Sequence, residues 1–443
     1  MRFRWAWLAT AAVILAGGCG GTQDPLDAEG KAGAVANPRE PIQAMLRERG
    51  KRLLAGDVEG YLAGLAPEAR AFEEPIARQA TSLPLSQIDL TIGEATISLD
   101  GTRFEDAKVT FNYRYEELPE DNPFQLHLLY QLEQQDGSWV VTGSAFDTET
   151  MGILPPPMWA IGPVEFTRSP HFLVMSRPGT PGVAEAVARA EQGSEQLLPK
   201  LTLEIDSRYL MVVAPNQEEY DALLPPPSEG GSLAAVLVEY HETAGHPLRP
   251  ELRHVIVNAP LLFRTTAVEL EDGGGLLDPT TVLQHELGHL ALSRFTRPCH
   301  ASWVVEGAAM WLAGERRTDE WRRMVATADL DRVAAKDTEE DDREQREGMG
   351  RDEHDPPSIS EIYLYPYANA AVSYLIETHG AEKFFDFYQN LKELMPPPMC
   401  NGRRPSEQVR AIGTDRILRR YYGFDLRDLD RFTREYVRKA VAE

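Results

Sequence analysis

Two patterns of apolar and polar positions follow one another in the first third of the chain. Residues 42–80 place apolar side chains at helical spacing, and Gly56-Asp57 breaks the pattern and starts a new helix. Apolar and polar residues then alternate in strand-like fashion, and Asp136-Gly137 is typical of a hairpin turn. The alternating stretches are 90–99, 107–118 and 124–146. Short helices followed by an antiparallel meander predict an α+β domain over residues 42–150.

A Pro-rich joint at 151–165 separates this unit from a second predicted domain, residues 166–443. Strands are predicted at 170–176, 208–215, 234–240 and 253–260, and helices at 183–198 and 216–224. Asp278-Pro279 predicts the start of a longer helix that reaches about Phe295. The rest is mainly helical, apart from the charged stretch 337–355, which predicts a solvated loop. The fold class is therefore α+β throughout.

The N-terminus has the pattern of an export signal. Arg2 and Arg4 precede an apolar run that is too short to span a bilayer comfortably. The ending Ala16-Gly17-Gly18-Cys19 resembles a bacterial lipobox, which implies a lipoprotein signal peptide over residues 1–19, lipidation of Cys19 and anchoring on the extracytoplasmic side of the cell envelope. A cleaved signal with an incidental cysteine is the alternative. Residues 20–41 have the composition of a flexible tether.

Composition and charge limit the partners. The chain has 443 residues, of which 42% are hydrophobic, enough for two cores. Its formal net charge of −24 disfavours nucleic acid. In an oxidising compartment, Cys299 and Cys400 are candidates for a disulfide, and two unpaired thiols are the alternative. The sequence leaves the oligomeric state open.

The strongest candidate chemistry lies in the helix that begins at Pro279, which contains the motif HELGH from His285 to His289. Helix positions four apart share one face, so both imidazoles can bind one Zn²⁺. Glu286 is placed to act as general base on water at such an ion without being a ligand. A random chain of this composition would contain about 0.02 such motifs, so the motif's context has to add weight.

That context includes one acid downstream. Glu306 is the lone ionisable group in the apolar run SWVVEGAAMWLAG, residues 302–314. Because an unpaired buried carboxylate is costly, Glu306 either faces water at a bend made by Gly307 or meets a cation. Zinc would satisfy it and complete a His-His-Glu set with one open position.

These residues resemble the gluzincin metallopeptidases, and more closely the peptidase MA-like family, over roughly residues 165–440. The resemblance implies one zinc ion, bound by His285, His289 and Glu306, with Glu286 as general base. Thermolysin-like enzymes carry an acid four residues after the third ligand, to orient a histidine. Met310 stands there in this chain, so the orienting residue must come from elsewhere.

Related families also use a downstream tyrosine or histidine to stabilise the oxyanion, and the block EIYLYPYANAAVSYLIETHG (361–380) resembles the corresponding peptidase MA-like segment. Tyr365 and Tyr367 both fit, and Tyr367 is preferred because it is predicted to start a helix. Tyr363 is a third candidate. Each tyrosine has packing as its alternative role.

The first domain resembles the cone-shaped domains of nuclear transport factor 2 and the SnoaL-type proteins over about 105 residues. The phrases LLAGDVEGYLAGL and DGSWVVTGSAF carry that likeness, which implies a packing or binding module.

Together these features predict a membrane-anchored zinc metallopeptidase with a peptide or protein substrate. The substrate is expected along an edge strand within 255–263. The alternatives are a ligand- or protein-binding lipoprotein with an inactive zincin-like domain, and an envelope assembly factor that uses the HELGH helix only as structure.

Overall fold

The computed structural model describes most of the two predicted domains. The described residues are 38–98, 101–119, 124–147, 155–224, 235–239, 253–263, 268–269, 276–277, 279–296, 300–326, 359–391 and 407–442. The signal peptide with Cys19, nearly all of the tether, the charged stretch 337–355, and both Cys299 and Cys400 lie outside them. The predicted lipid anchor and disulfide therefore stay predictions.

Three helices open the described chain, as the sequence predicts: α1 (Arg39–Leu54), α2 (Val58–Leu62) and α3 (Pro67–Ala80). The break between α1 and α2 has the predicted chemistry. Gly56 adopts a left-handed φ of 78°. The Asp57 carboxylate accepts a hydrogen bond of 2.8 Å from the backbone N–H of Gly60, which caps α2.

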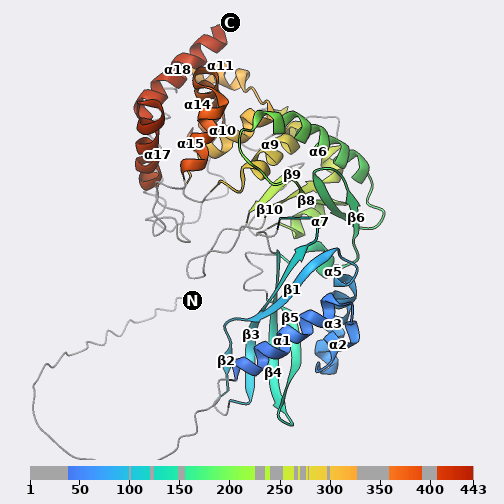
Figure 1. Ribbon diagram of the computed structural model, residues 1–443. Coiled ribbons are helices and arrows are strands. Elements are labelled where there is room, and N and C mark those ends of the chain that lie inside the picture. The colour runs from blue at the N-terminus through green and yellow to red at the C-terminus, as the bar shows by residue number, and fades with distance from the viewer. Residues whose placement is uncertain are drawn as a thin grey trace, which may run out of the picture. The chain divides into compact units, whose positions relative to one another are not determined.

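An antiparallel meander follows these helices (Figure 1). Its strands are β1 (Leu85–Ile92), β3 (Arg103–Tyr115), β4 (Phe124–Gln135) and β5 (Ser138–Phe146), with the short β2 (Thr96–Ile97) paired to β3. The hairpin turn is confirmed, since Asp136 and Gly137 both have positive φ between β4 and β5. The strand predicted at 90–99 starts earlier, at Leu85, and stops at Ile92. Helix α1 packs on β1 and α3 on β5.

The second sheet is mixed and has the order β6-β7-β8-β10-β9. The three inner strands are parallel to one another and the two outer strands antiparallel to their neighbours. The strands are β6 (Glu165–Arg168), β7 (Phe172–Ser176), β8 (Tyr209–Ala214), β9 (Ala235–Glu239) and β10 (Arg253–Asn258). The predicted edge strand within 255–263 is therefore wrong. Strand β10 is covered by β9, and residues Ala259–Leu262 form a short helix, α8, with Pro260 in its first turn.

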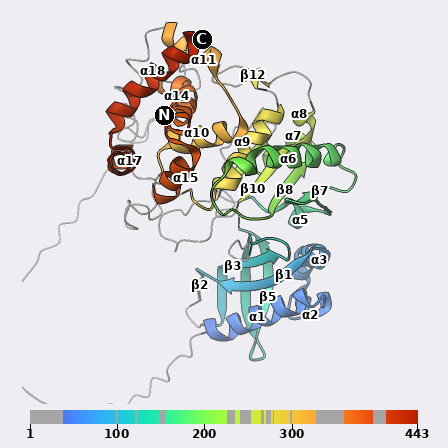
Figure 2. The same cartoon turned by 45° about the horizontal axis from the view of Figure 1, so that its top comes forward.

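Helices cover this sheet and continue beyond it (Figure 2). Helices α6 (Val183–Leu197) and α9 (Pro279–Leu292) pack on one face, where Met211, Val213, Val255 and Val257 share a buried apolar cluster with Leu283 and Leu287. The remaining elements are α5 (Met158–Ile161), η1 (Leu198–Lys200), α7 (Gln217–Ala222), β11 (Val268–Glu269), β12 (Leu276–Leu277), α10 (Ser302–Ala313), α11 (Thr318–Ala326), α14 (Ile359–His379), α15 (Ala381–Asn390), α17 (Glu407–Tyr422) and α18 (Leu426–Ala442). The α+β class, with small sheets and a helical C-terminal part, is confirmed.

Helix α14 corrects one prediction about the tyrosine block. It begins at Ile359, so Tyr367 lies inside the helix and does not start it. Pro366 suggests a helix start in the sequence but sits in the helix interior. Among the described residues, no helix is long and apolar enough to cross a membrane.

Candidate metal centre

Three helices approach one another closely because two glycines leave room between them. A Cβ on Gly288 of α9 would lie 3.0 Å from the Cα and the carbonyl oxygen of Ala309 in α10. A Cβ on Gly307 of α10 would lie 2.3 Å from the carbonyl oxygen of Ala368 in α14, closer than any real contact. The two glycines thus let α10 lie directly against both neighbours. Gly307 lies within a continuous helix, so the alternative in which Glu306 faces water at a bend there is wrong.

This packing brings the predicted ligands together. The Nε2 atoms of His285 and His289 lie 2.9 Å apart. The Oε2 atom of Glu306 lies 3.3 Å from each of them. The side chains are largely buried, with 12% of each imidazole and 22% of the carboxylate exposed. Glu306 thus faces the two imidazoles, and these three residues form a group that could hold a metal ion.

The Glu306 carboxylate and the two imidazoles favour one another's charged forms, although the charge of His285 lowers the pKa of His289. Burial lowers the pKa of His285, but hydrogen bonds to Glu306 and Glu315 outweigh it and hold the pKa well above its ordinary value. Burial also lowers the pKa of His289, but the charge of Glu306, the hydrogen bond to Glu306 and the charge of Glu286 together outweigh it and raise the pKa. Burial raises the pKa of Glu306, but both histidines overcome this and hold it far below the ordinary value. The carboxylate is thus ionised, as a metal ligand has to be.

Glu286 lies on α9 beside the first ligand and is partly exposed. Its negative charge contributes to the raised pKa values of His285 and His289. Burial, and then the charge of Glu286, also raise the pKa of Tyr220 on α7, which is fully buried. Glu286 is therefore within electrostatic range of both imidazoles, as a general base beside a metal must be.

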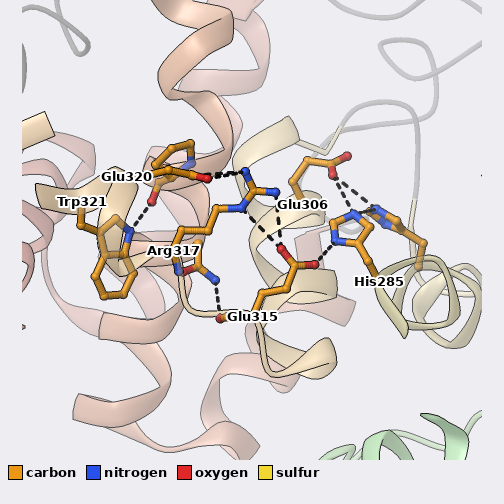
Figure 3. A network of polar contacts seen from close by, with 9 residues as sticks. His285, Glu306, Glu315, Arg317, Glu320 and Trp321 are labelled. Atoms are coloured by element: carbon orange, nitrogen blue, oxygen red, sulfur yellow. Dashed lines mark hydrogen bonds and ion pairs between the residues drawn. The ribbon is translucent and has the colours of Figure 1, made fainter. Parts of the chain in front are cut away.

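A third acid, which the sequence did not point to, contacts the site (Figure 3). Glu315 follows the C-cap glycine of α10, and its Oε1 lies 2.9 Å from Nδ1 of His285. Its side chain is 2% exposed. Met310, the position at which thermolysin-like enzymes carry an acid, is fully buried in the core. The charged run Glu315-Arg316-Arg317 directly after an apolar helix was the one available signal.

The two preferred tyrosines have different surroundings. The Tyr365 ring lies 5.3 Å from the guanidinium carbon of Arg317, whose Nε is 3.4 Å from Glu315. Tyr367 packs against a separate apolar cluster that includes Trp321. Tyr365 is therefore linked through Arg317 and Glu315 to His285. Tyr363 belongs to α14, but its side chain is outside the described part.

The chain matches no protein family model, and no curated protein matches it. Membership of the peptidase MA-like family therefore stays a prediction. Among solved structures, a protein of unknown function from Mycobacterium tuberculosis is 12% identical with a TM-score of 0.20, over 24% of this chain and 69% of that one. An NTF-2-like protein of unknown function from Shewanella oneidensis is 15% identical with a TM-score of 0.18, over 24% of this chain and 96% of that one.

An M1 zinc metallopeptidase from Deinococcus radiodurans is 13% identical with a TM-score of 0.28. The match covers 69% of this chain and 58% of that one. At these TM-scores, function has to be inferred from the chain's own residues.

Proposed function

We propose that this chain is a zinc-dependent peptidase. The observation that supports the proposal is the convergence of His285, His289 and Glu306 from two helices, with nitrogen and oxygen atoms 2.9 to 3.3 Å apart. Ligands around a tetrahedral zinc ion at about 2.1 Å lie roughly 3.4 Å from one another. Two imidazoles and one carboxylate are a set that zinc prefers, with one position left open for catalysis.

The chain's residues divide the chemistry of peptide hydrolysis between them. A zinc ion at this site would supply Lewis acidity, which makes water more acidic and a substrate carbonyl more electrophilic. Glu286 takes the proton from the attacking water and passes it to the leaving amine. Tyr365 donates a hydrogen bond to the oxyanion that forms on the carbonyl.

The substrate in this proposal is a peptide in extended conformation. Among the described strands, β9 is the outer neighbour of β10 and packs near α9. The edge of β9 that no described strand covers can pair with a peptide that runs past the site helix. A lipidated Cys19 would hold the enzyme at the extracytoplasmic face of a membrane, where the peptide substrate would be met.

Glu286→Gln tests the proposal directly. The variant removes the base but no ligand, so zinc content stays at one ion per chain while kcat for a quenched peptide library falls about 100- to 10,000-fold. Zinc content is measured by elemental analysis of the purified protein that lacks residues 1–19. A wild-type protein that binds zinc but hydrolyses no peptide would favour the binding lipoprotein.

A further inference from the structure

A buried polar network ties the metal centre to a helix that provides none of its ligands (Figure 3). Glu315 is its first member. One carboxylate oxygen lies 2.9 Å from Nδ1 of His285, and the other accepts two hydrogen bonds of 3.4 Å from Nε and an Nη of Arg317. Both oxygens are thus engaged, one on the ligand and one on a cation.

Arg317 is shared between two acids. Besides Glu315, its other Nη donates to both carboxylate oxygens of Glu320, at 3.4 and 3.2 Å. The Arg317 side chain is 5% exposed, so these contacts are formed away from solvent. The guanidinium therefore holds the Glu315 carboxylate in a fixed orientation, because its planar fork allows few alternatives.

Helix α14 fixes the backbone that carries both residues. The buried Asn369 donates from Nδ2 to the carbonyl oxygen of Glu315 at 3.1 Å, and its Oδ1 accepts from the backbone N–H of Arg317 at 3.4 Å. One helix turn earlier, the carbonyl oxygen of Pro366 accepts a 3.0 Å hydrogen bond from Trp321 Nε1. The segment after α10 is thus attached to α14 on both sides of Arg317.

We infer that Glu315 is the positioning residue of the metal centre, and that Arg317 and Asn369 make its position depend on α14. A hydrogen bond from Nδ1–H to Glu315 fixes the imidazole in the tautomer that leaves the Nε2 lone pair free, and Nε2 is the atom beside Glu306. The carboxylate adds a negative charge behind the ligand, which strengthens its interaction with a cation. The inference rests on the proposed zinc site, but not on hydrolysis.

Zinc affinity, measured by competition with a chromophoric chelator, tests this inference. Glu315→Leu should weaken zinc binding about 10- to 100-fold, as is typical when such an outer partner is lost. Glu315→Gln keeps an acceptor for the Nδ1–H of His285 and should weaken zinc binding less than Glu315→Leu. Long-range ¹⁵N NMR of the zinc-loaded protein should show His285 protonated at Nδ1 in wild type and in Glu315→Gln.

The adjacent arginines provide a matched control. Arg317→Gln should weaken zinc binding, whereas Arg316→Gln should not, because Arg316 is exposed and pairs only with Glu377 among the described contacts, at 2.9 Å. Asn369→Leu should also weaken zinc binding, although the described hydrogen bonds of Asn369 go to the backbone of Glu315 and Arg317 and not to a candidate ligand. Circular dichroism and thermal unfolding of the metal-free variants separate loss of affinity from loss of fold.

Two outcomes would overturn the inference without touching the proposed function. These are wild-type zinc affinity in a folded Glu315→Leu variant, and equal losses in Arg316→Gln and Arg317→Gln. A wild-type chain that binds no zinc would instead contradict the proposed function itself.

Discussion

Glu306 is a largely buried carboxylate, so its negative charge has to be compensated by a partner. A carboxylate transferred from water into a protein interior is costly unless it is paired. The Oε2 atom of Glu306 lies 3.3 Å from Nε2 of His285 and of His289, and these imidazoles offset that cost. If zinc binds as proposed, the imidazoles would have to be neutral, so binding would release protons.

The two tyrosines of α14 give the first prediction. Tyr365→Phe removes the proposed oxyanion donor and should lower kcat/KM for peptide hydrolysis about 100-fold or more, with zinc content unchanged. Tyr367→Phe is the matched control. Its ring packs in the cluster around Trp321, so the variant should hydrolyse peptides at the wild-type rate. Equal rates in the two variants would exclude Tyr365 from this role.

The three residues of the candidate metal centre could be predicted from the sequence because their spacing carries the geometry. His285 and His289 share a helix face by periodicity alone, and Glu306 is marked as the lone charge in an apolar helix. Glu315 could not be predicted in the same way. Its contact with His285 depends on where the chain turns after α10, and on Asn369 more than fifty residues later.

At the scale of elements, the site depends on how closely α9, α10 and α14 pack. Gly288 and Gly307 stand where a side chain would meet the backbone of the next helix. Glu306 lies in α10, and Glu315 lies just after the end of α10. If α10 moves away from its neighbours, both acids therefore move with it. The small residues are thus part of the metal centre although they bind nothing.

Gly307→Ala tests this dependence. The added methyl group would lie 2.3 Å from the Ala368 carbonyl oxygen, so α10 and α14 have to move apart. We expect a loss of about 1 to 3 kcal/mol in the free energy of unfolding, typical of overpacking, together with weaker zinc binding. Gly423→Ala, between α17 and α18, is the control for zinc affinity, because its added methyl group meets nothing within 4 Å and its positive φ lowers stability without touching α10. Unchanged zinc affinity in Gly307→Ala would contradict the role of this contact.

Two element predictions failed for reasons of tertiary structure. The sequence predicts that Tyr367 starts a helix, but α14 begins at Ile359 and continues through Pro366, whose carbonyl oxygen accepts a hydrogen bond from Trp321. Strand β10 has the apolar pattern that a half-covered edge strand and an inner strand share, and only its pairing with β9 distinguishes the two. Local pattern thus predicted a helix and a strand here, but not where the helix begins or which strand covers the other.

His379, at the end of α14, predicts how stability depends on pH. Burial, and then the charge of Lys383, lower its pKa below the ordinary 6.5. Its ring centroid lies 5.0 Å from that of Tyr422. Between pH 6.5 and the lower pKa of the folded protein, His379 therefore binds a proton in the unfolded chain but not in the folded one. The free energy of unfolding falls as the pH falls through this range.

Urea unfolding at several pH values checks this prediction. His379→Phe keeps an aromatic ring without a titrating group, so its stability should fall less between pH 7.5 and 5.5 than that of wild type, by an amount on the order of 1 kcal/mol or less. Parallel pH profiles for the two proteins would assign the pH dependence to other groups.

At the scale of the whole molecule, the two sheets differ in what they contribute. The meander of β1 to β5 encloses a buried ion pair, Arg49 and Glu73 at 2.7 Å, with Tyr61 as a further hydrogen-bond donor to Glu73. Arg49 of α1 and Glu73 of α3 pair with each other beside the first sheet and lie far along the chain from the candidate metal centre. The mixed sheet instead supports α9, which carries both imidazoles. Among the described residues, the three candidate ligands come from α9 and α10, the helices that pack with the second sheet.

The most direct test is the zinc content of the soluble chain and of three single variants. After exposure to zinc and gel filtration, the account predicts one zinc ion per wild-type chain, and far less in His285→Ala, His289→Ala and Glu306→Ala under the same conditions, with all three folded by circular dichroism. A wild-type chain without zinc, or a Glu306→Ala variant that retains the ion with wild-type affinity, would contradict the account.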